Sequence, residues 1–300
     1  MRKKIISVLV TIIFIELMIL SIVFISKNNA NKKETPQLHK NEVLVDSSQV
    51  NVSKIDETAI VKRNMQIPDS SKWESATEGS DIQFPIIAYS YLNNQASKET
   101  LSIENFTQQL EWLKKEDYYT LTPQEAYEVL TKNKKPAEKI IWLTFDNGYY
   151  NQYKFAFPLL QRYKMQATIN YLPNKEGNVT YANLYDLQEM LISGEINVES
   201  GTANGLALTD LKPSTLTTEI KQSKETLDTT LKQTTTTIAY PENSYNDDII
   251  EVAEEAGYKL GLTTNTGLAS KSNGLLSLSR IEISNDLPID EFTKLIGAAN

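Results

Sequence analysis

Apolar residues are unevenly distributed along the chain and divide it into three parts. Residues 5–25 are almost continuously apolar and follow three basic residues at the N-terminus. Residues 27–80 are rich in Lys, Asn, Ser, Asp and Glu and contain few aromatic residues. Beyond them, short apolar runs alternate with amphipathic stretches. We therefore expect an apolar N-terminal segment over residues 1–26, a polar stalk over residues 27–80 and a folded domain over residues 81–300.

Within the folded domain, predicted strands alternate with predicted helices. Residues 84–90 and 140–145 are apolar runs of strand length. Helical patterns cover residues 102–113 and 153–163, and another helix starts at Thr122, with proline in its first turn. This alternation is typical of parallel βα units, and a domain of about 220 residues is large enough for one core. The pattern predicts an α/β fold.

One of the apolar runs ends in residues that can carry chemistry. Residues 140–145 lead directly into Asp146, Asn147 and Gly148. A strand of a (β/α) barrel presents catalytic groups at its C-terminal end. The run resembles the first motif of the NodB-type polysaccharide deacetylases (carbohydrate esterase family 4), Thr-Phe-Asp-Asp-Gly, whose first Asp is a general base and whose second is a metal ligand. Here Asp146 takes the first position, and Asn147 replaces the second Asp.

The resemblance continues in order over residues 81–300. Segments similar to the opening strand, the second motif, the third motif with its helix and the closing strand are residues 84–90, 199–206, 238–247 with 256–258, and 279–281. In the second motif, Ser-His-Thr-x-x-His, Gly201 and Gly205 stand at the two histidine positions. The family's general-acid histidine has no counterpart. The resemblance implies the distorted (β/α) barrel of the NodB type, which we expect to be preceded by one transmembrane helix.

The resemblance also implies a metal site made of one Asp and two His. Asn147, Gly201 and Gly205 occupy these positions, and the chain's one histidine, His39, precedes the domain. An amide is a neutral donor, and glycine offers no side chain to a metal. We therefore expect the family's zinc or other divalent metal to be absent, with Asp146 as a remnant of the general base.

Each of these residues also has a simpler interpretation. Asp146 could cap the adjacent turn, and Gly201 and Gly205 could belong to a flexible loop. The resemblance places Tyr240 and Pro241 in the substrate groove, where the tyrosine either packs internally or stacks on a sugar ring.

Two glutamates lie beside the second and third motifs. Glu199 and Glu242 could join Asp146 in a cluster of carboxylates. The interpretation that we favour is that both are solvated charges at strand ends.

The N-terminal segment indicates export. At about 1.5 Å per residue, residues 5–25 are long enough to cross a bilayer. They form either a membrane anchor or a signal peptide. Ala30 is a small residue suited to cleavage, but Asn28 stands where a second small residue is needed. We favour an uncleaved, single-pass anchor in the cell membrane with an extracytoplasmic domain; cleavage would make the protein secreted.

The composition of the chain limits the classes of molecule that the protein is expected to bind. The net charge of −8 and the lack of a basic patch in the sequence argue against nucleic acid. The lack of cysteine excludes disulfides and a lipoprotein anchor. The expected partners are a cell-envelope glycan, either peptidoglycan or exopolysaccharide, or an envelope protein, besides the membrane itself.

Three functions therefore remain open. The first is a membrane-anchored pseudoenzyme that binds a glycan or a partner at the cell envelope, since a fold alone does not confer a reaction. The second is an active deacetylase of N-acetylated amino sugars that uses a rebuilt site around Asp146. The third is a structural partner in an envelope assembly. We favour the first, and the sequence leaves open whether the protein is an enzyme.

Overall fold

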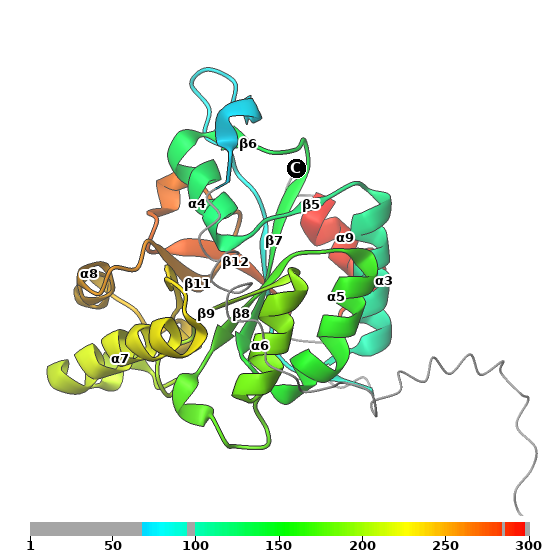
Figure 1. Ribbon diagram of the computed structural model, residues 1–300. Coiled ribbons are helices and arrows are strands. Elements are labelled where there is room, and N and C mark those ends of the chain that lie inside the picture. The colour runs from blue at the N-terminus through cyan, green and yellow to red at the C-terminus, as the bar shows by residue number, and fades with distance from the viewer. Residues whose placement is uncertain (1–67, 95–99, 284–285, 298–300) are drawn as a thin grey trace, which may run out of the picture. The chain divides into compact units, whose positions relative to one another are not determined.

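The computed structural model describes residues 68–94, 100–283 and 286–297 (Figure 1). All of them belong to one compact unit, Ser53–Asn300. No helix in this described part is long and apolar enough to cross a membrane. The expected membrane segment, residues 1–26, lies outside the described residues, so its prediction stays a prediction.

Parallel strands form a closed barrel, as the sequence predicted. Within the described residues, seven strands follow the order β2-β12-β11-β10-β9-β8-β7, and the ring closes because β2 also pairs with β7. Each of these pairings is parallel, and β5 extends the sheet beyond β7. The strands are β2 (Ile86–Tyr89), β5 (Tyr119–Thr120), β7 (Ile140–Asn147), β8 (Ala167–Tyr171), β9 (Ile196–Ser200), β10 (Thr237–Ala239), β11 (Leu260–Thr266) and β12 (Leu278–Ile283).

Helices cover the outside of the barrel. They are α3 (Ile103–Lys115), α4 (Pro123–Lys132), α5 (Phe157–Tyr163), α6 (Leu184–Ser193), α7 (Pro213–Leu231), α8 (Asp247–Glu255) and α9 (Ile289–Gly297). Figure 1 shows α3, α5 and α9 along one side and α7 and α8 on the other. Ser102 caps α3, and Thr122 caps α4 with Pro123 in its first turn. The helix expected at residues 153–163 begins as a π-helical turn, Gln152–Ala156, and continues as α5.

Shorter elements complete the described structure. They are the strands β1 (Glu74–Ser75), β3 (Leu92–Asn93), β4 (Leu101–Ser102) and β6 (Lys134–Lys135), and the 3-10 turns Ser70–Lys72, Pro173–Lys175, Leu208–Asp210, Pro241–Asn243 and Lys271–Asn273. β1 pairs antiparallel with β6, and the Ser70 hydroxyl donates a 3.0 Å hydrogen bond to Glu128. The end of the range that we expected to be stalk therefore packs against the domain.

The side chains of β7 alternate between two environments. Ile141, Leu143 and Phe145 join a large apolar cluster with residues of α3 and α5. Trp142 packs in a different cluster, and its indole N–H donates to the Thr168 hydroxyl at 2.8 Å. Asp146 has the same parity as Trp142, so its side chain points to the opposite face of the strand from the cluster with α3 and α5, and it lies at the C-terminal end of the strand.

Candidate functional site

Asp146 is held by an arginine from the strand that closes the barrel. Arg280 on β12 is 1% exposed, and its Nη1 and Nη2 atoms donate to the two Asp146 carboxylate oxygens at 2.9 and 2.8 Å. Its Nε atom donates to the Thr263 carbonyl and Nη1 to the Thr144 hydroxyl. A two-pronged ion pair of this kind fixes both the position and the orientation of the carboxylate. Asp146 is therefore bound to a partner far along the chain and does not act mainly as a turn cap.

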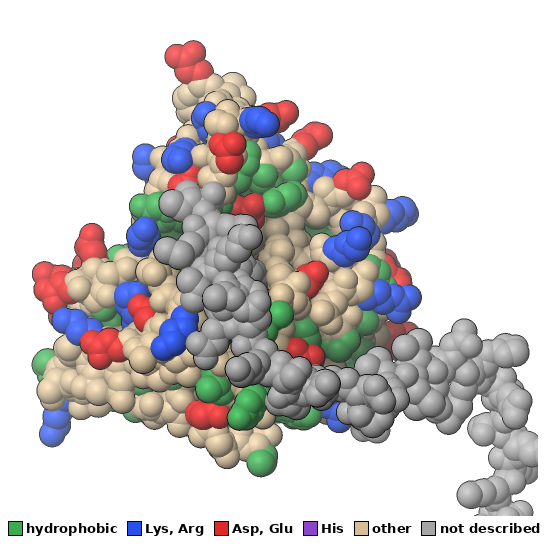
Figure 2. Space-filling view, viewed as in Figure 1, with side chains coloured by type: hydrophobic (Ala, Val, Ile, Leu, Met, Phe, Trp, Pro, Cys, Tyr) green, Lys and Arg blue, Asp and Glu red, His purple; other side chains and the backbone are tan. Residues whose placement is uncertain are grey.

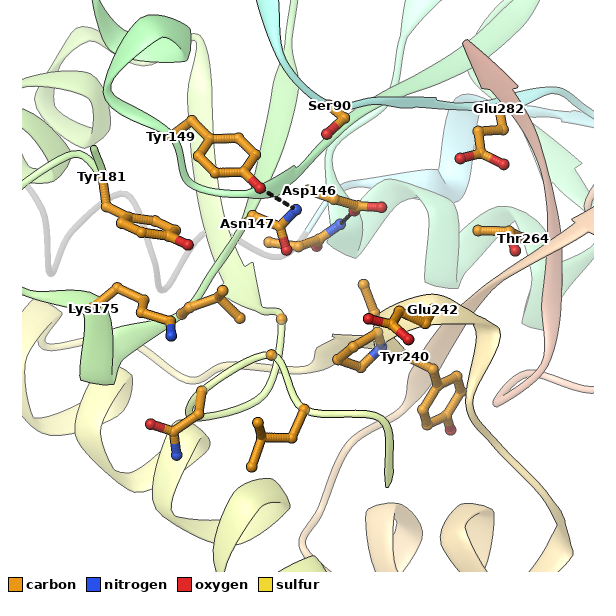
Figure 3. Close-up of a pocket in the computed structure, with 18 residues that line it drawn as sticks. Ser90, Asp146, Asn147, Tyr149, Lys175, Tyr181, Tyr240, Glu242, Thr264 and Glu282 are labelled. Carbon is orange, nitrogen blue, oxygen red and sulfur yellow. Dashed lines mark hydrogen bonds between the residues drawn. The ribbon is translucent and has the colours of Figure 1, made fainter. Parts of the chain in front are cut away.

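Asn170 on β8 completes the surroundings of Asp146. Its Nδ2 atom donates to Asp146 Oδ1 at 2.8 Å (Figure 3). The side chain is fully buried, and its Oδ1 atom has no hydrogen-bond partner among the described residues. A buried amide oxygen without a donor is costly, so this atom is an open acceptor at the site.

Asn147 turns the chain at the end of β7. Its φ of 73° lies in the left-handed region, which asparagine tolerates better than most residues. Its amide Nδ2 is directed to the Tyr149 hydroxyl at 3.3 Å. The side chain is thus engaged with a tyrosine at the position where the family resemblance implies a metal ligand.

Gly201 and Gly205 lie against one leucine. A Cβ atom on Gly201 would come within 3.0 Å of Leu172 Cδ2 and 2.9 Å of the Asn170 carbonyl oxygen. A Cβ atom on Gly205, whose φ is +75°, would come within 2.9 Å of Leu172 Cδ1. Leu172 is 3% exposed. The space next to both glycines is therefore filled, and any larger residue would require a rearrangement.

These residues surround a pocket of about 650 Å³ at the barrel mouth. Figure 3 shows Lys175 and Tyr181 on one side of this pocket and Glu242 and Glu282 on the other. The remaining lining residues include Ser90, Asp146, Asn147, Tyr149, Asn170, Leu172, Gly201, Gly205, Leu206, Tyr240, Pro241 and Thr264. The structure thus brings the predicted residues Asp146, Asn147, Gly201, Gly205, Tyr240 and Pro241 to one pocket.

Tyrosines form one wall of the pocket. The rings of Tyr149 and Tyr181 stack with centroids 5.2 Å apart, and the edge of Tyr91 meets Tyr149 at 5.3 Å. Tyr91 is 39% exposed. Partly exposed aromatic rings of this kind combine an apolar face with polar edges, a surface suited to a sugar.

The structure bears on the two interpretations of Tyr240, internal packing and stacking on a sugar ring. It lines the pocket but is 2% exposed, its ring stacks on Tyr245, and its hydroxyl donates to the Leu276 carbonyl at 3.0 Å. This geometry favours the packing interpretation of Tyr240.

The prediction for Glu199 was wrong, whereas Glu242 is exposed and lines the pocket. Glu199 is 2% exposed and accepts hydrogen bonds from the backbone N–H groups of Thr236 and Thr237 at 2.8 and 2.7 Å. Burial raises the pKa of the Glu199 carboxyl to about 8, although these two hydrogen bonds act in the opposite direction. The carboxyl is therefore neither solvated nor part of a pocket cluster.

Comparisons with known proteins agree with this architecture. The model of the family described as polysaccharide deacetylase matches residues 132–261. YxkH of Bacillus subtilis, a protein assigned to the polysaccharide deacetylases, is 36% identical over 216 residues, which are 72% of this chain and 76% of the relative. The chain belongs to the polysaccharide deacetylase family. The family resemblance inferred from the motifs is thereby confirmed.

Other members of the family are also similar. The poly-β-1,6-N-acetyl-D-glucosamine N-deacetylase of Staphylococcus aureus is 29% identical over 218 residues, covering 65% of this chain and 75% of the relative. The structure of the Streptococcus pyogenes deacetylase PplD in complex with acetate is 36% identical and superposes with a TM-score of 0.70 over 72% of this chain and 99% of that one. BC0361, a polysaccharide deacetylase from Bacillus cereus, is 25% identical with a TM-score of 0.66, over 72% and 69% of the two chains.

The residues at the mouth do not fit the metal of polysaccharide deacetylases. The donor set implied by the motifs has become the Asn147 amide and two glycines, and Leu172 fills the space beside both glycines. In the described part of the chain, no group of three or more His, Cys, Asp or Glu side chains is arranged to hold a metal ion. The positions that correspond to the family's Asp and two His ligands therefore offer a metal neither a carboxylate nor an imidazole.

Arg280, Asn170 and Glu282 are among the site residues that sequence reasoning missed. Arg280 lay within the recognised closing segment, but nothing local signalled its ion pair. The alternation of side chains along a strand would place Asn170 and Glu282 at the mouth only once the order of the strands in the barrel is known. That order could not be predicted, because β8 and β12 are far apart in sequence.

Proposed function

We propose that this protein is a membrane-anchored, extracytoplasmic polysaccharide deacetylase-like protein that binds a cell-envelope glycan without metal-dependent deacetylase activity. The observation that carries the proposal is the loss of the donor set at Asn147, Gly201 and Gly205 together with the packing of Leu172 over the two glycines. Metal catalysis contributes several kcal/mol to the transition state of such a hydrolysis, and each 1.36 kcal/mol lost costs about tenfold in rate. Asp146, already paired with Arg280, does not replace that contribution.

The pocket supports glycan binding. Its volume of about 650 Å³ is in the range of small-molecule sites. Tyr149 and Tyr181 line one side of it with stacked aromatic rings, and its other side offers carboxylates and amides for sugar hydroxyls. The Staphylococcus aureus relative is named for a polymer of N-acetylglucosamine, which makes a hexosamine polymer the first candidate.

The place of action follows from the N-terminal sequence. The basic residues before residues 5–25 and the length of this apolar run favour an uncleaved anchor whose folded domain is outside the cytoplasm. Charges on the described domain are mixed: Figure 2 shows basic and acidic side chains interspersed over one face. Such a surface suits a neutral or cationic glycan better than a nucleic acid.

The test uses the full-length chain purified in detergent. After incubation with excess zinc and dialysis, metal analysis should find well under one zinc per chain. Incubation with N-acetylglucosamine pentamers should release no acetate, whereas calorimetry should detect their binding.

An Asp146→Asn variant serves as the control for contaminating hydrolases. Acetate release by the wild type that disappears in this variant would mean that the site is an active, rebuilt deacetylase. One tightly held zinc per chain would contradict the proposed loss of the metal site. No binding of any hexosamine oligomer would favour a purely structural role.

A further inference from the structure

One carboxylate of the pocket has a basic partner, and two others have none among the described residues. Asp146 is neutralised by Arg280. Glu242 and Glu282 also line the pocket, and within the described part of the chain neither forms an ion pair or a hydrogen bond through its carboxylate. Lys175, the basic residue among those that line the pocket, is on the opposite side, beside Tyr181 (Figure 3). One side of the pocket therefore carries uncompensated negative charge.

Glu242 is held in a strained backbone conformation. Its φ of 52° and ψ of 28° lie in the left-handed region, which costs a residue with a side chain more than it costs glycine. The next residue, Asn243, fixes the turn to β11 by donating to Asn265 Oδ1 at 3.0 Å and accepting from the Thr264 N–H at 2.8 Å. This turn therefore holds the Glu242 side chain at the rim of the pocket.

Asn170 provides a second, independent sign of a ligand. It is fully buried and lines the pocket, and within the part of the chain that the structure describes its Oδ1 atom lacks a hydrogen-bond donor. A ligand that donates from an N–H or O–H group would remove this deficit.

We propose that the pocket is selective for a hexosamine with a free, protonated amine, that is, for a de-N-acetylated glycan rather than its N-acetylated form. This inference rests on the proposed glycan binding and specifies its ligand. An ammonium group only donates, so it matches the acceptors Glu242, Glu282 and Asn170. An acetamide carries no charge and one N–H, so it lacks the electrostatic attraction of an ammonium group to these two exposed carboxylates.

The experiment compares two probes on the full-length chain in detergent. Glucosamine pentamers and the same pentamers fully N-acetylated, in β-1,4 and β-1,6 linkage, are titrated by calorimetry at low salt. We expect the free-amine pentamer to bind about tenfold more tightly, the effect of about one charge-assisted contact. Added salt should weaken the binding of the free-amine pentamer and leave the binding of the acetylated one unchanged.

Matched variants locate the preference. Glu242→Gln with Glu282→Gln should remove the advantage of the free amine, so that the two pentamers bind this variant with similar affinity. Glu254→Gln, an exposed glutamate of α8, should retain the wild-type preference.

The outcomes separate this inference from the function on which it rests. Equal binding of both pentamers, or tighter binding of the acetylated one, would overturn the amine preference while glycan binding stands. A preference that persists in the double variant would overturn the role of the two glutamates. Binding of neither pentamer would overturn the glycan function itself, and the amine preference with it.

Discussion

Glu199 is an acid that the barrel keeps away from water. The carboxyl is 2% exposed, and both backbone donors reach the same oxygen, Oε2. Burial raises its pKa from the usual 4.5 to about 8. The group is therefore protonated in the folded protein at pH values where it is ionised in the unfolded chain.

This shift predicts how stability depends on pH. Between about pH 5 and pH 8, the folded state binds more protons at Glu199 than the unfolded state, so the free energy of unfolding falls as pH rises. A full pKa unit corresponds to about 1.4 kcal/mol. We expect the wild type to lose roughly 1–3 kcal/mol over this interval relative to Glu199→Gln, whose amide oxygen can accept the same hydrogen bonds. Urea unfolding at both pH values measures the difference.

Glu254→Gln is the control, since this exposed side chain should follow the wild type at each pH. Parallel stability curves for the wild type and Glu199→Gln would show that Glu199 is ionised in the folded protein, contrary to the prediction.

Some site residues could be predicted from the sequence, and others could not. Asp146, Asn147, Gly201 and Gly205 lie in short contiguous motifs, so their spacing alone identified them. Arg280 is 134 positions from Asp146, and only closure of the barrel brings the two together. An ion pair between distant strands leaves no local pattern in a single sequence.

At the scale of elements, the segment after β8 determines what the turn after β9 can hold. Leu172 follows β8 and lies against both Gly201 and Gly205. The Asn170 carbonyl adds a backbone contact on the Gly201 side, which a side-chain rotation cannot relieve. The packing of the two loops therefore leaves room only for glycine at positions 201 and 205. Histidine at either position would have to displace Leu172.

Rebuilding the metal site should accordingly require more than the ligands. We expect Asn147→Asp with Gly201→His and Gly205→His to be less stable than the wild type and to take up little zinc, because Leu172 occupies the space. Adding Leu172→Ala should raise the zinc content toward one per chain. Metal analysis after dialysis measures the content, and thermal unfolding measures the stability.

Leu172→Ala alone is the matched control and should bind no more zinc than the wild type. If the triple variant already holds one zinc per chain at wild-type stability, Leu172 moves aside freely and does not restrict the loops.

Elements with strong local signals were predicted well. Ser102 and Thr122 cap α3 and α4 because each places a side-chain oxygen opposite free N–H groups of the first turn. The pairing of β1 with β6 was not predicted: both strands are two residues long and polar, so neither shows an alternating pattern. The π-helical turn before α5 was missed because its residues fit an ordinary helical period.

At the scale of the whole molecule, the parallel barrel gathers the site. The C-terminal ends of its strands meet at one mouth, which places Asp146 of β7, Asn170 of β8 and Glu282 of β12 around one pocket. A glycan can reach this pocket only if the domain is outside the cytoplasm. The proposed function therefore depends on where the domain is placed as well as on the barrel.

The last prediction concerns this placement and distinguishes an anchor from a signal peptide. If residues 1–26 form an uncleaved helix with the basic residues inside, the full-length chain should sediment with membranes and resist salt extraction. External protease should release the domain from intact cells, whereas deletion of residues 1–30 should leave the chain in the cytoplasm. Mature protein in the medium with an N-terminus near Asn31 would show that the segment is cleaved. Protection from protease in intact cells would overturn the extracytoplasmic placement, and with it an envelope glycan as the ligand.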